Sequence, residues 1–578
     1  MEKPPTVEQR GSVSDLPTFD VAILGGGVAG LTLALELHKE LPHLDVAIIE
    51  RNEHPVPETT HKVGESTVEI AAHYLRDRLG LADHLDQDQL RKFGLRMFFT
   101  GHGNSDITQR VELGSSIFAP LTSYQLDRGR LENELGRRCA AAGVHFLSGH
   151  SVDRIALDPG EAPHSVTLSG PAGQRTLQAQ WIVDASGRAQ LLRRHLKLNR
   201  TKVGHSANAA WFRVAHPLDV EEWTQDPSWA QRISEGERAL STNHLMGSGY
   251  WVWLIRLATG ATSVGIVAGA EHHDFSTFNT LERALGFLSE HEPQCAKAVV
   301  PHIDKIKDFR VMRDYSYSCD KVFSGQQRWC MTGESGVFLD PLYSPGLDLI
   351  AISNGLVVDL LRRSGLGQDV GPVADLHDIL FLRLTNLWLA TYENQYGLMG
   401  NAQVMSSKVI WDTAFYWAVF GLLFFQDKFR EVGSTPSIAE TLEELSVTSN
   451  RMQQFFREWD GVGNSELDPQ FIDLLAPIEF MLRLHSEMTD DLTPAQFEQR
   501  FRGNAEFLAQ LAGQLMNTVI RACAERLDEA SIEQVQAWQR DEHVSHFVAT
   551  FRRERLKNPT TDRWIPVGSP RANCTTPS

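Results

Sequence analysis

The chain has 578 residues, of which 42% are apolar, and this length suits roughly two to four domains or one large, elaborated domain. Its 55 basic and 73 acidic residues give a formal net charge of −18, which argues against nucleic acid or an anionic membrane as the main partner. The six cysteines are scattered and form no C-x-x-C pair, so we expect buried thiols in a reducing, cytoplasmic setting. No run of about 18 apolar residues occurs and the N-terminal segment is polar, so we expect neither a membrane span nor a secretory signal.

The first elements along the chain predict a strand, a glycine turn and a helix. The apolar run 21–24 is typical of a buried strand, and the uninterrupted stretch 31–37 is typical of a helix. A second apolar run, 46–49, predicts another strand, and it ends at Glu50. An acidic side chain at that point can bind the ribose hydroxyls of a dinucleotide.

Three glycines occupy the turn with G-x-G-x-x-G spacing. Gly25 allows a tight turn, Gly27 allows the backbone to approach a pyrophosphate, and Gly30 allows close packing of helix and strand. Ala29 lies in the same first turn, where the helix N-terminus attracts phosphates. The pattern predicts a Rossmann-like dinucleotide site, and the alternative is a glycine turn in an ordinary α/β unit.

The remaining chain predicts a central β-rich stretch followed by helices. Further strands are expected at 92–99, 144–147, 165–168, 181–184, 208–214, 249–257, 262–267 and 310–318, and helices at 69–80, 128–142, 276–291 and 347–363. The segment 414–425 is a run of apolar residues that suits a buried core helix, with a substrate cover or a dimer face as alternatives. We expect the following organisation: 1–17 disordered N-terminus, 18–204 cofactor domain, 205–328 β-rich substrate region, 329–365 return to the cofactor domain, 366–556 helical region, and 557–578 flexible tail.

Five separated motifs follow one another in a fixed order. They are the glycine turn, Val63-Gly64-Glu65-Ser66, Lys92 on its strand, Trp251-Val252-Trp253-Leu254-Ile255, and Gly333 followed by Asp340-Pro341-x-x-Ser344-x-Gly346. Over roughly residues 18–365 the chain therefore resembles the flavin-dependent halogenases, the tryptophan-halogenase-like branch of the flavin monooxygenase superfamily. The resemblance implies an α/β fold: a Rossmann-like FAD-binding domain of flavin-monooxygenase type, a β-sheet substrate region and a helical C-terminal region.

The resemblance also implies a chemistry. In that family, reduced FAD and O₂ give a C4a-hydroperoxide, halide attacks it, and the resulting hypohalous acid moves to a lysine that presents it to an electron-rich aromatic carbon. Lys92 matches that lysine, and a partly desolvated amine suits the task because its pKa is lowered. The alternative is a solvated lysine at a strand end. No second strand-linked glycine fingerprint occurs, which favours a two-component enzyme that takes its electrons from a separate flavin reductase.

Further site residues follow from the same motifs. Trp251 and Trp253 share one face of their strand and are expected, with Tyr343, to wall the substrate pocket. Arg128 and Asp340 match residues that meet the cofactor phosphates or ribityl chain, with a helix-start arginine as the alternative for Arg128. The peptide nitrogens after the serine of the turn open a helix and favour an anion or the flavin edge. At this turn we expect Gly346 and Leu347 to bind the cofactor, and Ser344 and Gly346 to bind the halide.

The chain departs from the family pattern at three positions. Tyr343 replaces the glutamate that assists proton loss in tryptophan-acting members, which points to a phenol or another activated ring. Pro345 has no N–H, so one donor for chloride is missing, and bromide becomes the more favourable halide. Arg256 replaces a proline after the Trp-x-Trp-x-Ile strand.

These departures leave three functions open: a halogenase, a flavin-dependent hydroxylase or oxidase on the same scaffold, and a non-catalytic flavin-binding partner. We expect no metal. The substrate is a small aromatic molecule, free or carrier-bound, and an oligomer is compatible with the sequence.

Overall fold

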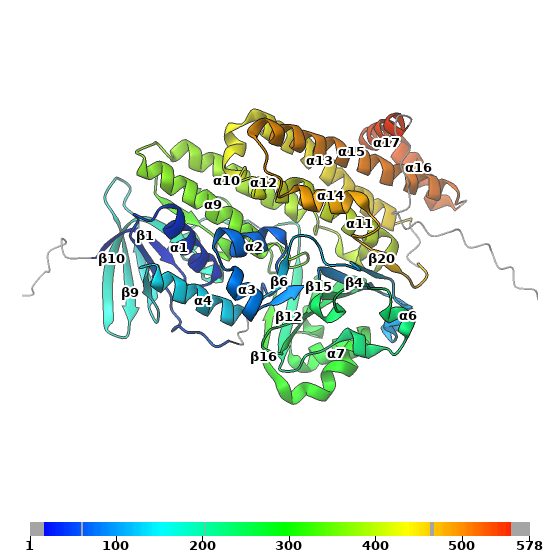
Figure 1. Cartoon of the computed structure of the whole chain (residues 1–578), viewed down its shortest axis with the longest axis horizontal. Helices are drawn as coiled ribbons and strands as arrows, with labels where there is room; N and C mark the ends of the chain where they lie inside the picture. Colours follow the sequence, from blue (N-terminus) through cyan, green and yellow to red (C-terminus); the bar gives the residue numbers. More distant parts are fainter. Residues whose placement is uncertain (1–16, 59–61, 202, 463–466, 527, 556–578) are drawn as a thin grey trace, which may run out of the picture.

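The predicted dinucleotide unit lies at the centre of an eight-stranded mixed sheet (Figure 1). The computed structural model describes residues 17–58, 62–201, 203–462, 467–526 and 528–555. The N-terminus predicted to be disordered, 1–17, apart from Pro17, and the predicted flexible tail, 557–578, therefore lie outside the described residues. The sheet order is β18-β19-β10-β1-β2-β7, and β8 and β9 extend β10 as an antiparallel hairpin. Its strands are β1 (Thr18–Leu24), β2 (Val46–Ile49), β7 (His145–Leu147), β8 (Ser151–Ala156), β9 (His164–Gly170), β10 (Gly173–Asp184), β18 (Phe323–Ser324) and β19 (Trp329–Met331).

The parallel part of this sheet is buried on both faces. The central strands β1 and β2 are apolar throughout their inner residues, as expected for strands covered by helices on each side. Helix α1 (Val28–Glu40) packs against α4 (Arg128–Ala141) and α9 (Gly346–Gly365). Five cysteines lie in the described residues, and all five are buried and free.

The second sheet also has eight strands, in the order β16-β12-β15-β14-β13-β4-β5-β20. They are β4 (Leu95–Phe99), β5 (Glu112–Gly114), β12 (Ala207–Val214), β13 (Thr242–Gly247), β14 (Tyr250–Arg256), β15 (Thr262–Gly269), β16 (Ile306–Met312) and β20 (Phe471–Asp473). The strand predicted at 92–99 is two strands, because Gly94 takes a φ of +80° and ends the first of them. The first piece, β3 (Leu90–Lys92), pairs with β6 (Ser123–Gln125).

Alternation along β14 assigns the two faces of this sheet. Val252 and Leu254 belong to a hydrophobic cluster under α7 (Leu281–His291) and α8 (Pro293–Val299), whereas Trp251 and Trp253 belong to the main core. The predicted common face of the two tryptophans is therefore confirmed. That face is turned toward the rest of the molecule.

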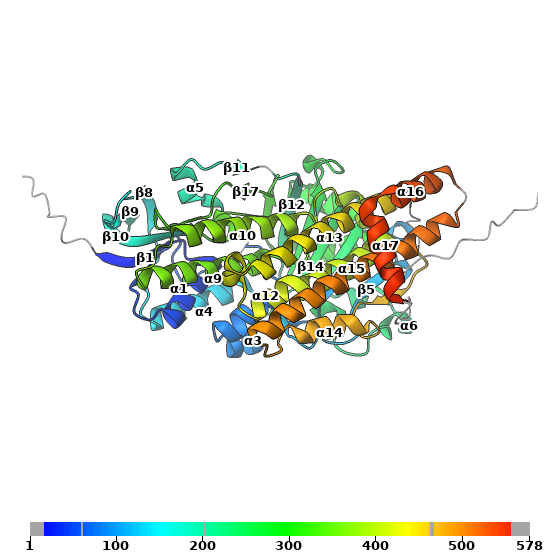
Figure 2. The same ribbon diagram turned by 90° about the horizontal axis from the view of Figure 1, so that it is seen from above.

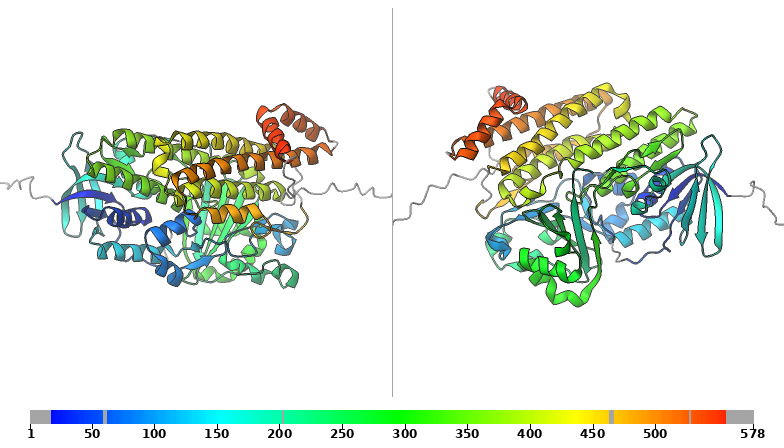
Figure 3. Two further views of the ribbon diagram at one scale, coloured as in Figure 1. Left: turned by 45° about the horizontal axis from the view of Figure 1, so that its top comes forward. Right: turned by 180° about the vertical axis from the view of Figure 1, so that it is seen from behind.

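A layer of helices lies along both sheets (Figures 2 and 3). It contains α10 (Gly371–Leu389), α11 (Ala402–Phe415), α12 (Leu422–Phe425), α13 (Pro436–Asp460), α14 (Glu479–Glu487), α15 (Pro494–Ala524), α16 (Glu529–Arg540) and α17 (Glu542–Arg555). Shorter helices α2 (Glu69–His73), its π-helical continuation (Tyr74–Arg78) and α3 (Ala82–Asp88) precede β3. The helical region also supplies β20, which pairs in parallel with β5 at the edge of the second sheet.

The apolar segment of the helical region is longer than its twelve-residue core suggests. Helix α11, a π-helical stretch (Tyr416–Gly421) and α12 form one helix of 24 residues, Ala402–Phe425, which is long and apolar enough to cross a membrane by length and composition alone. In the fold, however, 83% of its apolar window is buried inside the protein. This burial agrees with the interpretation as a core helix.

Candidate functional site

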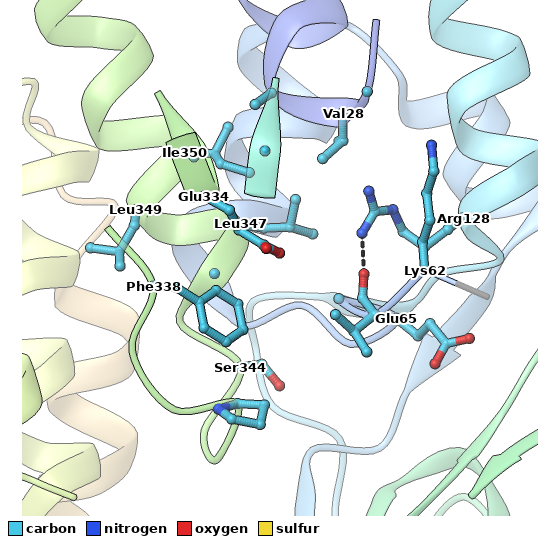
Figure 4. A pocket seen from close by; sticks show the side chains of 18 of the residues that line it. Val28, Lys62, Glu65, Arg128, Glu334, Phe338, Ser344, Leu347, Leu349 and Ile350 are labelled. Carbon is cyan, nitrogen blue, oxygen red and sulfur yellow. Dashed lines mark hydrogen bonds between the residues drawn. The ribbon is translucent and has the colours of Figure 1, made fainter. Parts of the chain in front are cut away.

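A cavity of about 320 Å³ runs from the glycine turn to the tryptophans of β14. Its lining comes from the β1–α1 turn, the start of α4, the core-facing side of the second sheet and the start of α9 (Figure 4). We call the part around Gly27, Glu50 and Arg128 the glycine end, and the part around Trp251 and Trp253 the tryptophan end. The residues around the glycine turn that were predicted to bind the cofactor and the tryptophans predicted to wall the substrate pocket therefore share one cavity.

The three glycines of the turn have different physical roles. A Cβ at Gly25 would lie 2.3 Å from the Ala185 carbonyl oxygen, and a Cβ at Gly30 would lie 2.0 Å from the Gly25 carbonyl oxygen, so both positions need glycine for packing. A Cβ at Gly27 would meet nothing within 4 Å, and Gly27 lines the cavity at the start of α1. This opening at a helix N-terminus is a suitable place for an anionic group such as a pyrophosphate, and Ala29 lines it as well.

Glu50 is held at the end of β2 as an acceptor facing this opening. One carboxylate oxygen accepts a hydrogen bond from the Gly26 N–H at 2.7 Å. The other accepts from the Asn52 N–H at 2.8 Å and from the Asn52 side-chain amide at 2.6 Å. Backbone and amide donors fix the orientation of the carboxylate, which leaves remaining lone pairs for ribose hydroxyls.

Arg128 opens α4 and points into the cavity (Figure 4). Its guanidinium donates to the Glu132 carboxylate at 2.7 Å and to the Val63 carbonyl, and Lys62 also pairs with Glu132. The Nε of Arg128 is buried without a hydrogen-bond partner in the described part of the chain. Two cations around one carboxylate leave a surplus positive charge, and an unpaired buried donor suits a phosphate or another acceptor.

Glu334 is a cavity residue that the sequence reasoning missed. It follows β19 and the Gly333 turn, lines the cavity between its two ends and contacts the Arg188 guanidinium at 3.1 Å (Figure 4). Burial raises the pKa of Glu334, and Arg188 and Arg128 oppose that rise. A buried strand followed closely by an acid was the available signal: Glu334 comes three residues after β19, whereas Glu50 directly follows β2.

Asp340 lines the cavity, but its carboxylate is held by other protein groups. Oδ2 accepts hydrogen bonds from His205 at 2.7 Å, Tyr315 at 2.8 Å and Tyr396 at 2.6 Å, and Oδ1 accepts from the Leu342 N–H at 2.9 Å. Burial pushes the pKa of Asp340 up, but the hydrogen bonds from His205 and Tyr396 outweigh it and the pKa is lowered. The expected contact of Asp340 with the cofactor stays a prediction, and Glu334 is a second acid that lines the same cavity.

The tryptophan end is braced by hydrogen bonds from both indoles. Trp251 donates to the Tyr396 hydroxyl at 3.1 Å, so this wall is tied to the Asp340 cluster. Trp253 donates to the Ser263 hydroxyl at 3.1 Å, and the two indole rings are 5.7 Å apart. Both tryptophans line the cavity, as expected of pocket walls.

Tyr343 is not among the residues that line the described cavity, and its expected place in the wall of the substrate pocket stays a prediction. Tyr343 and Ser344 take φ values of +67° and +61°, and the centroid of the Tyr343 ring lies 6.2 Å from that of Tyr392. Ser344, Gly346 and Leu347 line the cavity at the start of α9. The Gly346 and Leu347 N–H groups belong to the first turn of α9, lack intrahelical partners and so stay available to an anion. The Ser344 N–H instead donates to the Pro341 carbonyl at 3.0 Å, and the halide role of Ser344 and Gly346 stays a prediction.

Lys92 lies directly behind the cavity wall. The side chain is 4% exposed, and Nζ donates to the Ser66 hydroxyl at 2.8 Å and to the Thr67 carbonyl at 2.7 Å. The Ser66 hydroxyl also contacts the Thr242 hydroxyl at 2.9 Å, and Ser66 and Thr242 both line the cavity. Burial lowers the pKa of Lys92 to about 8, with Glu69 opposing the shift. The buried amine differs from the solvated strand-end lysine that was the alternative.

Comparisons with known proteins show which proteins this chain is similar to. Residues 18–260 match the family model described as an FAD binding domain. The chain is 26% identical over 434 residues to the flavin-dependent halogenase chlA of Dictyostelium discoideum, covering 69% of this chain and 70% of the relative. It is 25% identical to a 1H-pyrrole-2-carbonyl–peptidyl-carrier-protein chlorinase of Pseudomonas fluorescens, covering 61% and 78%. The structure of halogenase PltM superposes with a TM-score of 0.61 at 15% identity over 83% of this chain and 98% of that one.

Proposed function

Because this chain is an FAD-dependent oxidoreductase related to the flavin-dependent halogenases, we propose that it halogenates an electron-rich aromatic substrate, phenolic or similar. One observation carries the proposal: a buried lysine is separated from the FAD cavity by two hydroxyl groups, those of Ser66 and Thr242. A lysine in this place has no evident use in FAD binding, because it lies outside the glycine end.

The glycine end fits FAD. The open position at Gly27 and the unpaired Nε of Arg128 would hold the pyrophosphate, Glu50 would hold the ribose, and Glu334 faces the region between the two ends. The bound cofactor, reduced by a separate flavin reductase, would supply with O₂ the oxidising power that converts halide to hypohalous acid. The Gly346 N–H at the start of α9 and the Ser344 hydroxyl would hold the halide, since the Ser344 N–H already donates to the Pro341 carbonyl.

Lys92 would then hold and present the hypohalous acid. The Ser66 and Thr242 hydroxyls are the cavity groups nearest to the amine in the hydrogen-bond chain, so they form the route by which a small polar molecule reaches Nζ. With a pKa of about 8, roughly one Lys92 in ten is neutral at pH 7, against about one in three thousand for an ordinary lysine. The charged amine donates a hydrogen bond to the hypohalous oxygen, and the neutral amine can form an N–halogen bond with loss of water.

Tyr343 stands where tryptophan-acting members of the family have a glutamate, and this supports a substrate with an activated ring, such as a phenol, rather than free tryptophan. The chlorinase named above and a brominase of Pseudoalteromonas luteoviolacea, 25% identical over 365 residues, are named for pyrrole rings carried on a peptidyl carrier protein. A substrate panel should therefore contain free phenols and carrier-bound aromatics. The reductase partner and the cytoplasmic setting belong to the same proposal.

A substrate panel with FAD, a flavin reductase, O₂ and either chloride or bromide tests the proposal by product mass. A product that gains halogen supports it. A product that gains only oxygen replaces it with the hydroxylase alternative. FAD binding without any product mass change favours the non-catalytic flavin-binding partner.

A further inference from the structure

Replacement of hydrogen by halogen on an aromatic carbon releases one proton, and a group at the tryptophan end must accept it. Tyr343 cannot do so, since it does not line the cavity and burial raises its pKa well above its ordinary value. The question is which cavity residue has a free lone pair beside the route to Lys92.

His244 meets this requirement. It lies on β13, lines the cavity, and its ring centroid is 5.4 Å from that of Trp251. Its Nδ1 is 3.1 Å from the Arg96 carbonyl oxygen, which can only accept, so Nδ1 carries the hydrogen. Nε2 is then the ring nitrogen that carries the lone pair and can accept a proton.

His244 also stands next to the point where Lys92 meets the cavity. It follows Thr242 by two residues on β13, so both side chains lie on one face of the strand, roughly 7 Å apart along it. The Thr242 hydroxyl contacts Ser66, which in turn accepts a hydrogen bond from Lys92. A ring bound against Trp251 thus has the halogen donor and the imidazole on the same wall.

The carboxylates nearby are already engaged. Glu65 lines the cavity but pairs with the Arg213 guanidinium at 2.8 Å. Asp340 accepts hydrogen bonds from three side chains and one backbone N–H, as described above. Asp348 accepts from the Tyr416 hydroxyl at 2.7 Å, and it is not among the cavity residues.

The environment of His244 gives it a suitable basicity. Burial lowers the pKa of His244 from 6.5 to about 4, and the positive charge of Lys92 adds to the shift, while the Arg96 and Thr242 carbonyls oppose it. The ring is therefore neutral at pH 7. Its conjugate acid has about the pKa of an ordinary carboxylic acid, near 4, so it matches the strength of the glutamate that is missing here.

We infer that His244 is a further catalytic residue, whose Nε2 accepts the ring proton during halogenation; this rests on the proposed function. The aromatic carbon forms a bond to the halogen of hypohalous acid, and the oxygen–halogen bond breaks with its electron pair left on oxygen. The C–H electron pair then restores the aromatic ring as the proton moves to Nε2. The imidazolium passes that proton to the hydroxide, which leaves as water, and His244 is neutral again.

The test is His244→Asn in the full-length protein with FAD, reductase and bromide. Asparagine keeps a donor near the Nδ1 position for the Arg96 carbonyl and removes the basic nitrogen. With phenol as the probe, bromination should slow by about 10²- to 10⁴-fold, the usual contribution of a general base. Ring-deuterated phenol should react at the same rate as phenol in the wild type but more slowly in the variant, because proton loss has become rate-limiting. If the variant does not fold, His244→Gln carries the same test.

A β-diketone scavenger separates this inference from the proposed function. Both proteins should release the same amount of trapped hypobromous acid when phenol is left out. The matched control is His164→Asn. His164 is a buried histidine of β9 that does not line the cavity, and its Nδ1 accepts a hydrogen bond from the Asp158 N–H at 2.9 Å. The His164→Asn protein should brominate phenol at the wild-type rate.

Four results would count against the inference or against the proposed function on which it rests. A His244→Asn protein that brominates phenol at the wild-type rate overturns the role of His244. A slower variant with no isotope effect also overturns it, since the loss is then structural. A wild type that yields no trapped hypobromous acid contradicts the proposed function itself, and a wild type that yields it but brominates no phenol contradicts the phenolic substrate and the inference together.

Discussion

Lys92→Met should abolish halogenation and yet stabilise the folded protein near neutral pH. The amine is buried, and its hydrogen-bond partners, the Ser66 hydroxyl and the Thr67 carbonyl, are neutral. A buried cation without a directly paired carboxylate is costly, so this position favours function over stability. Methionine keeps the apolar stem and removes the charge, the hydrogen-bond donor and the nucleophile.

The magnitude follows from the pKa of Lys92, which burial lowers from 10.5 to about 8. A shift of this size corresponds to about 3 kcal/mol of lost stability while the amine is charged. Below pH 8 the Lys92 amine is protonated in both the folded and the unfolded chain, so the full loss of folding stability applies. Between pH 8 and 10.5 the amine of the folded chain is deprotonated first, so the loss of folding stability becomes smaller. Above pH 10.5 the amine is neutral in both states and this loss of stability disappears. Methionine forfeits two hydrogen bonds, roughly 1–2 kcal/mol, so the net gain near pH 7 is about 1–2 kcal/mol.

The assay is urea unfolding of the FAD-free wild type and variant at pH 7 and at pH 10, beside product yield. The variant should unfold at higher urea at pH 7, and the difference should narrow or reverse at pH 10. Product should be absent, while trapped hypohalous acid persists. A variant that is less stable than the wild type at pH 7 refutes the burial argument, and one that keeps most of its product yield shows that Lys92 is not the halogen-presenting residue.

Lys408→Met is the matched control, because the same substitution should have the opposite effect on stability. Lys408 on α11 is equally buried, but its Nζ lies 2.7 Å from the Asp412 carboxylate and 2.6 Å from the Gln453 side-chain oxygen. Removing it leaves a buried carboxylate without its cation, which costs about 3–5 kcal/mol. Opposite signs for the two variants would separate the unpaired lysine from the ion-paired one.

Gly27→Val should leave the unfolding midpoint of the FAD-free protein nearly unchanged, because a Cβ there meets nothing within 4 Å, but it should abolish FAD binding measured by flavin fluorescence. Retained FAD binding would show that the proposed position of the cofactor is wrong. In competition between equal concentrations of the two halides, brominated product should exceed chlorinated product, because Pro345, the residue before α9, has no N–H and bromide is the more easily oxidised ion. A strong preference for chloride contradicts this reasoning. Glu334→Gln should weaken FAD binding without loss of folding, as seen by titration calorimetry, and an unchanged affinity would remove Glu334 from the cofactor site.

Local patterns predicted the parts of the site that depend on local geometry. The roles of Gly25, Gly27 and Gly30 follow from the spacing of a single turn, and the packing distances around the first and third glycines agree with it. The common face of Trp251 and Trp253 follows from strand alternation. These features need no knowledge of which distant segments meet.

Features that depend on distant contacts were missed or left open. Strand β13 was not predicted, because its sequence, TNHLMG, is not an apolar run, and its place between β14 and β4 buries it regardless. The direction of the Tyr343 side chain could not be predicted, because in a turn it depends on φ, which the sequence does not show. Lys92 was recognised by its motif, but its burial depends on Ser66 and Thr242, which come from segments far apart in the chain.

The helical region completes the site rather than covering a finished one. Tyr396, in the turn between α10 and α11, donates to Asp340 and accepts from Trp251. Tyr416 donates to Asp348, whose pKa burial raises to about 8. His485 on α14 contacts Glu69 at 3.2 Å, and the negative charge of Glu69 is the main one that opposes the lowered pKa of Lys92. The change in sequence pattern near residue 365 therefore separates two kinds of structure but not two functions, because the charge balance around the lysine and the bracing of the tryptophan wall both depend on side chains beyond it.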